Sequence, residues 1–184
     1  MPAGRPTLLP PPAPKDSLRI YKVCVVCLGN ICRSPMAETL IRAELAAAGL
    51  ADLVSVESAG TGDWHVGERM DRRARAELAR RGYDGSAHRA RQIGPHWIDQ
   101  FDLLIAMDAS NLRNLQAMAA GKDGMTERIR LFRSFDPAAP PGASVPDPYG
   151  GGPDEFAAVF DMVLAAARGL AAGLSDMLAG EGDG

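Results

Sequence analysis

Four short apolar runs, each followed by a segment with helical periodicity, constrain the fold of this 184-residue chain more than any other feature. The runs are Ile20–Val26, Leu53–Val56, Asp102–Met107 and Ile129–Phe132, and their short length and apolar content are typical of strands. Strands that alternate with helices form a parallel sheet with helices on both faces. The pattern therefore predicts a single α/β domain with a four-stranded parallel sheet.

Helices are predicted between and after these strands by stripes of apolar residues at helical spacing. The stripes lie within residues 36–48, 72–81, 111–120 and 156–178. A glycine follows each of the first three, which is the residue favoured just after a helix end. Asp154 and Glu155 precede the last stripe, where carboxylates suit the positive end of the helix dipole.

Composition and charge exclude several classes of protein. The 20 basic and 23 acidic residues give a net charge of −3, which argues against a nucleic-acid or membrane-surface binder. The most apolar stretch, residues 156–178, is interrupted by Asp161, Arg168 and Asp176, so no membrane-spanning segment is predicted. Three cysteines are too few for a disulfide scaffold. We expect a cytoplasmic protein.

The two ends of the chain differ in composition from the middle. Residues 1–17 contain six of the 14 prolines and residues 180–184 are rich in glycine. Proline-rich sequence favours neither a helix nor a central strand, so we predict disordered tails over 1–17 and 180–184 around a domain spanning 18–179. A proline-rich segment can also serve as a ligand, which leaves open an interaction protein that acts through this tail.

The loop after the first strand, Cys27–Pro35, carries the residues best suited to chemistry. Parallel sheets bind ligands off the carboxyl ends of their strands. Gly29 permits a tight turn, and a loop running into a helix start directs several amide N–H groups inward, which makes an anion cradle. Arg33 adds a planar fork that matches two phosphate oxygens. A helix N-terminus and a nearby cation also favour a thiolate, so Cys27 is predicted to be a nucleophile directed at phosphorus.

The spacing of Cys24 and Cys27 superficially suggests a metal or redox pair. A structural zinc site needs about four ligands, and the chain has no second such pair. Successive strand residues point to opposite faces, which also separates the two thiols. We predict that Cys24 is a core residue and that the chain has no metal site.

The segment Val26–Glu38, with the sequence VCLGNICRSPMAE, resembles the signature of the low-molecular-weight protein tyrosine phosphatases. The resemblance extends over about Ile20 to Leu178 and looks closest to the actinobacterial branch. Its other matching pieces are Ser58–Thr61, His88–Ile93, Met107–Asn111 and Asp147–Gly150. It implies a phosphotyrosine protein phosphatase I-like fold and hydrolysis of phosphotyrosine in proteins or peptides. It further implies that no cofactor is needed, that phosphate-like oxyanions inhibit, and that the protein is a monomer or weak homodimer.

The resemblance also implies roles for individual residues. Cys27 would be the nucleophile, Arg33 would bind the phosphoryl oxygens, and Asp147 would be the general acid and then the general base. Residues expected to bind phosphate or support the loop are Leu28, Gly29, Asn30, Ile31, Cys32, Ser34, Ser58 and His88. Residues expected to line the substrate cleft are Trp64, His65 and Tyr149. Many relatives carry a second aromatic residue where this chain has Gly150, so one wall of the cleft is expected to be open.

Three other functions remain open on the same scaffold. A thioredoxin-coupled arsenate reductase needs two further cysteines downstream, and none follows Cys32. Protein-arginine phosphatases of this type tend to carry threonine where Ile31 stands, and a bulky Ile31 favours phosphotyrosine. A non-catalytic phosphate-binding module would have no need to keep both Cys27 and Asp147.

Overall fold

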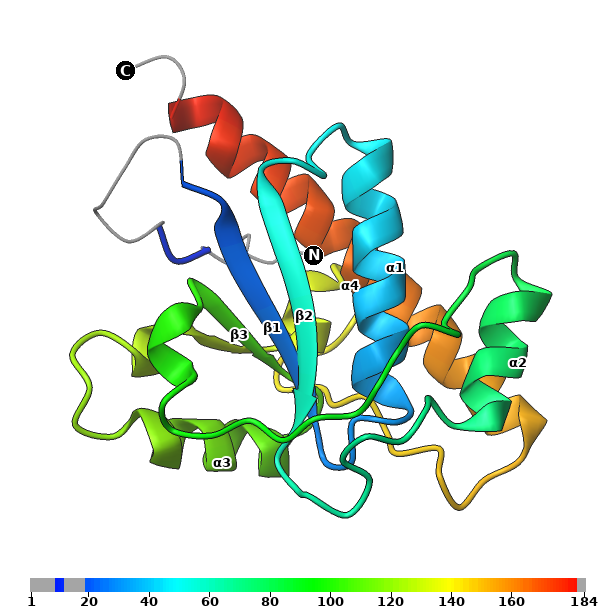
Figure 1. Cartoon of the computed structure of the whole chain (residues 1–184). Helices are drawn as coiled ribbons and strands as arrows, with labels where there is room; N and C mark the ends of the chain where they lie inside the picture. Colours follow the sequence, from blue (N-terminus) through cyan, green and yellow to red (C-terminus); the bar gives the residue numbers. More distant parts are fainter. Residues whose placement is uncertain (1–8, 12–18, 182–184) are drawn as a thin grey trace.

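The sheet has four strands in the spatial order β2-β1-β3-β4 in the computed structural model, which describes residues 9–11 and 19–181. The strands are β1 (Tyr21–Cys27), β2 (Val54–Gly60), β3 (Leu103–Ala106) and β4 (Ile129–Leu131), and all pairings are parallel. The predicted four-stranded parallel sheet is therefore confirmed (Figure 1). Because β1 pairs with both β2 and β3, its carboxyl end lies at the topological switch point where such sheets bind ligands.

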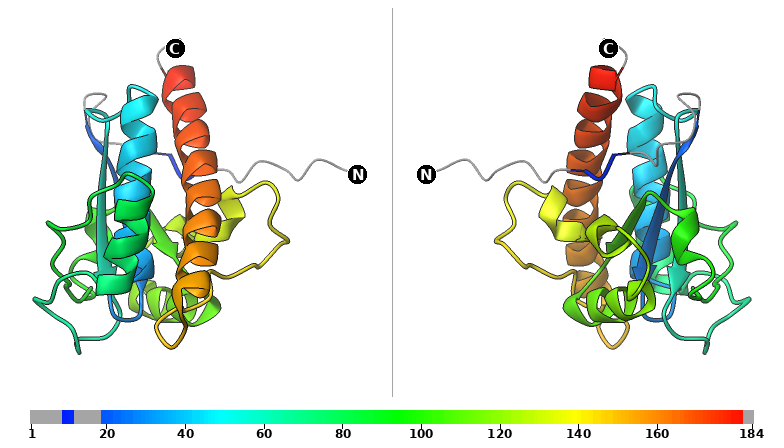
Figure 2. Two further views of the ribbon diagram at one scale, coloured as in Figure 1. Left: turned by 90° about the vertical axis from the view of Figure 1, so that its right-hand side faces the viewer. Right: turned by 90° about the vertical axis from the view of Figure 1, so that its left-hand side faces the viewer.

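Helices cover both faces of the sheet, as predicted. They are α1 (Arg33–Ala47), α2 (Arg72–Arg80), α3 (Ala109–Ala119) and α4 (Pro153–Glu181), with short 3-10 helices η1 (Ile98–Gln100), η2 (Thr126–Arg128) and η3 (Phe132–Phe135) in the connections. α1 and α4 pack side by side on one face, and α3 lies on the other (Figure 2). β2 extends to Gly60, beyond the predicted end at Val56. Its last residues have weak strand propensity and are held by pairing with β1 instead.

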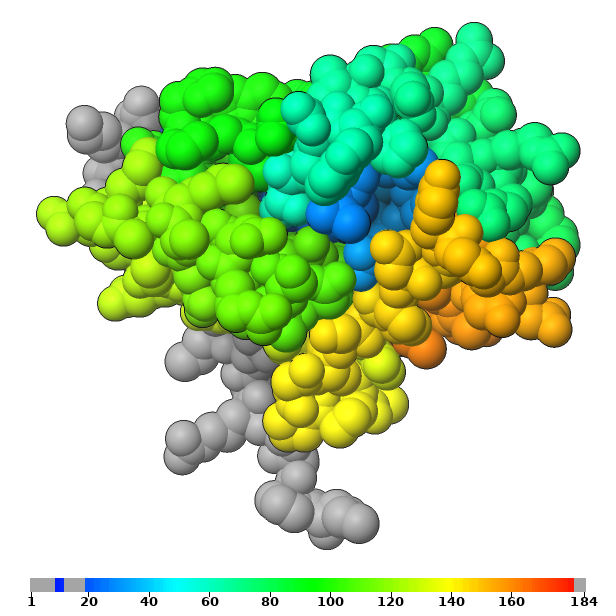
Figure 3. Space-filling view, turned by 90° about the horizontal axis from the view of Figure 1, so that it is seen from below, coloured from blue at the N-terminus to red at the C-terminus, as the bar shows by residue number. Residues whose placement is uncertain are grey.

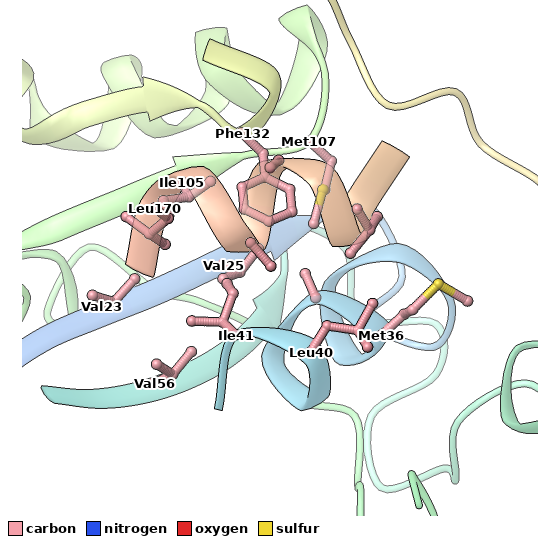
Figure 4. Close-up of a cluster of buried hydrophobic side chains, with 14 of the residues drawn as sticks. Val23, Val25, Met36, Leu40, Ile41, Val56, Ile105, Met107, Phe132 and Leu170 are labelled. Atoms are coloured by element: carbon pink, nitrogen blue, oxygen red, sulfur yellow. The ribbon is translucent and has the colours of Figure 1, made fainter. Parts of the chain in front are cut away.

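Two hydrophobic clusters sandwich the sheet, and β1 contributes to both in alternation. Val23, Val25 and Cys27 belong to the cluster under α1 and α4, whereas Cys24 and Val26 belong to the cluster under α3. Figure 4 shows the first cluster, in which the two valines of β1 meet side chains of α1 and α4. Cys24 is fully buried on the face opposite Cys27, as predicted.

α4 is long and apolar enough to cross a membrane by length and composition alone, the one such helix in the described residues. The apolar stripe of α4 packs in the protein core, however. Its buried side chains include Phe156, Phe160, Val163 and Leu170. Packing on α1 therefore accounts for the apolar character of α4.

The ends of the described chain are more ordered than the sequence predicts. Pro10 is buried, and its carbonyl accepts a hydrogen bond from the Tyr21 hydroxyl at 2.8 Å, while Leu9 packs beside Gly173 on α4. α4 continues to Glu181, so Gly180 is helical rather than part of a tail. The rest of the predicted tails, residues 1–8, 12–17 and 182–184, lies outside the described residues.

Candidate active site

The segment Cys27–Ser34, here called the Cys27 loop, leaves the end of β1 and enters α1. Asn30 organises this loop from its centre, with the left-handed φ of 56° that asparagine tolerates. Its backbone N–H donates to Cys27 Sγ at 3.2 Å. Its side-chain Nδ2 donates to Ser34 Oγ at 2.8 Å and to Ser58 Oγ at 3.0 Å. The fully buried Asn30 therefore contacts the Cys27 sulfur through its backbone and links Ser34 to Ser58 through its side chain.

Groups outside the loop hold Asn30 in place. The backbone N–H of Arg91 donates to Asn30 Oδ1 at 2.9 Å, and His88 Nε2 donates to the Asn30 carbonyl at 2.6 Å. Burial lowers the pKa of His88, which favours a neutral ring that still donates from Nε2. Ser58 donates to Glu38 at 2.5 Å. The structure thus brings Asn30, Ser34, Ser58 and His88 into one hydrogen-bonded network.

Cys27 and Cys32 lie in the same loop but in different surroundings. Two groups can donate a hydrogen bond to Cys27 Sγ: the Asn30 N–H and the Ser34 hydroxyl, which lies 3.0 Å from the sulfur. Burial raises the pKa of Cys32, with the Asp71 carboxylate adding to the effect, so Cys32 stays a neutral thiol. The two thiols of the loop therefore differ: Cys27 Sγ lies among hydrogen-bond donors, whereas Cys32 is held in its neutral form by burial.

The backbone of the loop is fixed by the segment that follows β2. Thr61 N–H donates to the Cys27 carbonyl at 2.9 Å, Gly62 N–H to the Leu28 carbonyl at 2.9 Å, and Asp71 N–H to the Ile31 carbonyl at 2.8 Å. A side chain at Gly60 would place its Cβ 2.7 Å from the Leu28 carbonyl, so only glycine allows this approach.

These contacts also fix the direction of the loop amides. In a trans peptide the C=O and the next N–H point in opposite directions. The carbonyls of Cys27, Leu28 and Ile31 are held by the flanking segments, and that of Asn30 by His88, so the following amides face the inner side of the loop. Converging amides at a helix start form a cradle for an anion.

Arg33 is nearly completely buried at the start of α1 and is held by three groups from distant parts of the chain. Its guanidinium lies 2.7 Å from Asp108 Oδ2, donates to the Val145 carbonyl at 2.9 Å, and lies 3.5 Å from Asp147 Oδ2. The contact with Asp147 joins residues that the sequence separates by more than a hundred positions. Arg33 and Asp147 also line the same cavity as Cys27.

Asp108 was missed by the sequence analysis, although Met107–Asn111 was among the matching segments. It follows β3 directly and caps α3 by accepting from the Asn111 N–H at 2.8 Å. Its position at the carboxyl end of the strand next to β1 is the signal that could have identified it.

The loop before α4 carries Asp147 to the mouth of the site. Val145 pins this loop to the end of β3, because its N–H donates to the Met107 carbonyl at 2.7 Å while its own carbonyl binds Arg33. The Asp147 side chain remains 47% exposed, and its Oδ1 accepts from the Tyr149 N–H at 3.1 Å. Asp147 is thus held in position and still accessible to a substrate.

Between these groups lies a cavity of about 250 Å³. Trp64, His65 and Tyr149 form its rim, its buried floor contains Cys27, Ile31, Cys32 and Arg33, and Leu28 and Gly29 line its side. Figure 3 looks onto this face, with the blue Cys27 loop at the bottom of a hollow between the turquoise segment around residue 64 and the golden segment around residue 149. Nothing lies within 4 Å of a Cβ built at Gly150, in keeping with the expected open wall.

The rim has a support that the sequence analysis also missed. The Arg73 guanidinium lies 5.4 Å from the centre of the Tyr149 ring and 4.7 Å from that of Phe156. Arg73 also pairs with Asp71 at 3.0 Å and donates to the Gly151 carbonyl at 3.1 Å. It ties the start of α2 to the loop that carries Tyr149.

The family model for low molecular weight phosphotyrosine protein phosphatases matches residues 22–179. The chain belongs to this family. A low molecular weight protein-tyrosine-phosphatase of Streptomyces coelicolor is 48% identical over 161 residues, which cover 87% of this chain and 97% of that protein.

Solved structures agree with this family assignment. YfkJ from Bacillus subtilis is 34% identical with a TM-score of 0.79, over 88% of this chain and 98% of that one. The tyrosine phosphatase Wzb from Escherichia coli K30, solved in complex with sulphate, is 27% identical with a TM-score of 0.73, over 85% and 99% of the two chains.

Membership of this phosphatase family identifies the protein as a hydrolase of phosphorylated proteins and sets the arsenate reductase and non-catalytic readings aside. The described residues contain no group of three or more His, Cys, Asp or Glu side chains that could hold a metal.

Proposed function

We propose that this phosphatase hydrolyses phosphotyrosine in proteins through a cysteinyl-phosphate formed on Cys27. The arrangement of Cys27, Arg33 and Asp147 around one cavity is the observation that carries the proposal. Two groups can donate to the sulfur, the buried guanidinium lines the same cavity, and the exposed carboxylate lies at its mouth.

In the first step the Cys27 thiolate attacks phosphorus, an S–P bond forms, and the bond from phosphorus to the phenolic oxygen breaks. Asp147, entering the step protonated, gives its proton to the departing phenolate. Arg33 and the inward-facing amides bind the three phosphoryl oxygens. These hydrogen bonds become stronger in the transition state, where negative charge is spread over the three oxygens. Asp108 keeps the Arg33 fork oriented toward the cavity.

In the second step water attacks the phosphorus of the cysteinyl-phosphate. The Asp147 carboxylate takes a proton from that water, the S–P bond breaks, and inorganic phosphate and the Cys27 thiolate are released. The Ser34 hydroxyl lies 3.0 Å from the sulfur and donates to it as the thiolate leaves. The hydrogen bond lowers the energy of the leaving thiolate in this step and of the free nucleophile in the first.

The depth of the site supports phosphotyrosine as the substrate. Cys27 is almost fully buried below a rim of Trp64 and Tyr149. A phosphorylated aromatic ring can reach the sulfur while its face contacts the rim, whereas the short side chain of phosphoserine would leave the rim uncontacted. Ile31 lines the same cavity and adds an apolar wall that suits an aryl ring better than a charged guanidine.

We also infer that phosphate and similar tetrahedral oxyanions compete with the substrate, because the amide cradle and Arg33 recognise the anion itself. The sulphate complex of the related Wzb supports this inference. We further propose that the protein is cytoplasmic and is a monomer or weak homodimer. Sedimentation at increasing protein concentration would measure its oligomeric state.

The test is a substrate panel assayed in the presence of a metal chelator. We expect turnover of p-nitrophenyl phosphate and of phosphotyrosine peptides, little turnover of matched phosphoserine or phosphoarginine peptides, and no effect of the chelator. Cys27→Ser should be inactive, whereas Cys24→Ala, which changes a core thiol on the other face of the sheet, should retain activity. Turnover by Cys27→Ser, or a preference for phosphoarginine, would overturn the proposal.

A further inference from the structure

A second hollow of about 520 Å³ lies beside the active-site cavity and shares two of its walls, Leu28 and Trp64. We call it the α3 groove, because Ala117 and Met118 of α3 form its far side together with Pro95. The residues that line it in the described part of the chain carry no charge. The far side of this groove, formed by Pro95, Ala117 and Met118, has no role in the mechanism above.

The wall common to both hollows is unusually apolar for an exposed feature. Trp64 is 69% exposed and Leu28 is 43% exposed, although Leu28 belongs to the Cys27 loop itself. Exposed apolar patches of this kind mark binding surfaces, and tryptophan is prominent among residues that contribute most to binding. This ridge therefore faces a hollow on each of its two sides.

The position of the ridge is fixed relative to the catalytic sulfur. The Gly62 N–H donates to the Leu28 carbonyl at 2.9 Å, and the Trp64 ring lies over Gly62 so closely that a Cβ there would come within 1.9 Å of it. On the opposite side the Pro95 carbonyl accepts from Lys122 Nζ at 2.7 Å, and Lys122 pairs with Asp99 at 2.6 Å. The Leu28–Trp64 ridge and the Pro95 side of the groove are thus preformed, which reduces the entropy that binding a ligand would lose.

We propose that the α3 groove is a specificity subsite that binds an apolar side chain of the substrate close in sequence to the phosphotyrosine. The inference rests on the proposed function and names the peptide class that the same site prefers. A peptide chain leaving the cavity over Leu28 and Trp64 enters the groove within a few residues, since an extended chain advances about 3.3–3.6 Å per residue. The uncharged walls disfavour a charged side chain, which would lose hydration without gaining a partner.

The experiment is a scan of phosphotyrosine peptides in which leucine or aspartate replaces glycine at each of the three positions before and after the phosphotyrosine. The readout is kcat/KM for each peptide divided by kcat/KM for p-nitrophenyl phosphate. We expect leucine at one or two positions to raise this ratio about tenfold, the scale of discrimination that one apolar side chain provides, and aspartate to give no gain.

Two variants of α3 separate the groove from general effects of charge. Ala117→Glu places a carboxylate in the groove, whereas Gln116→Glu adds the same charge one residue away, outside the lining residues. The leucine gain should disappear in Ala117→Glu and persist in Gln116→Glu. In Ala117→Glu, lysine at the same peptide position should now raise the ratio, and this gain shows that a folded variant has changed its preference.

The outcomes distinguish the two proposals. Absence of turnover on every substrate would contradict the proposed function. Turnover of p-nitrophenyl phosphate with equal ratios for all peptides, or a leucine gain that survives in Ala117→Glu, would overturn the subsite and leave the phosphatase activity standing.

Discussion

Asn30 at the floor of the cavity and Trp64 at its rim show how differently the two regions are built. Asn30 is fully buried, and its side-chain oxygen and nitrogen both have partners. Trp64 is 69% exposed and rests on Gly62. The floor is fixed by hydrogen bonds that reach the Cys27 sulfur and hold the loop backbone, whereas the rim presents exposed apolar area. We therefore expect changes in the floor to affect the chemical step and changes in the rim to affect the choice of peptide.

Asp147 tests this comparison most severely, because it lies in a rim loop but is pinned to the floor through Val145 and Arg33. Asp147→Ala should lower kcat on the order of 10²–10⁴-fold, the range of general acid–base catalysis. The loss should be larger for aryl phosphates with poor leaving groups, since these depend most on the proton. Asp154→Ala removes an exposed carboxylate at the start of α4 and is the control, with activity close to that of the unmodified protein. Equal losses for good and poor leaving groups would contradict the role of Asp147 as the acid.

Arg33→Lys should lower kcat on the order of 10²–10³-fold, as expected when one preorganised donor to the transition state is lost. A lysine keeps the charge but has no planar fork to bridge Asp108, the Val145 carbonyl and the substrate. Arg168→Lys, at an exposed position on α4, is the matched control. Near-normal kcat in Arg33→Lys would show that charge alone suffices at the floor.

Asn30→Ala should reduce both activity and the free energy of unfolding, the latter by about 2 kcal/mol or more, because buried partners of the asparagine lose their hydrogen bonds. Asn30→Gly removes the same side chain but accepts the left-handed φ without strain. The difference between the two variants should be about 1–2 kcal/mol in urea unfolding. Two variants of equal stability would argue that the backbone conformation of Asn30 carries no cost.

Trp64→Ala should have the smallest effect and should separate the rim from the floor. We expect kcat for p-nitrophenyl phosphate to change about twofold or less, and KM for phosphotyrosine peptides to rise severalfold, since an exposed aromatic wall contributes binding rather than chemistry. Val66→Ala removes another exposed apolar side chain nearby that does not line the cavity. A large fall in kcat for Trp64→Ala would mean that the rim takes part in the chemical step.

The difference between local contacts and contacts across the fold explains which features the sequence could predict. Strand–helix alternation gave the fold, and the local order of residues in Cys27–Ser34 gave the floor, because a short loop between a strand and a helix has few conformations available. Asp108, Val145 and Arg73 were missed because their roles come from contacts between elements distant in the chain. The length of β2 was missed for the same reason, since its last four residues are held by pairing with β1 rather than by their own strand propensity.

The central claim is that the phosphoryl group is transferred to the Cys27 sulfur before hydrolysis, and trapping this intermediate tests it best. Unmodified protein and Asp147→Ala are mixed with p-nitrophenyl phosphate, quenched in acid within one turnover, and digested for mass spectrometry. We predict the added mass of one phosphoryl group on the peptide that contains Cys27, absent in Cys27→Ser and intact in Cys24→Ala. A phosphoryl group on any other residue, or full turnover with no label on Cys27 at any quench time, would contradict the account.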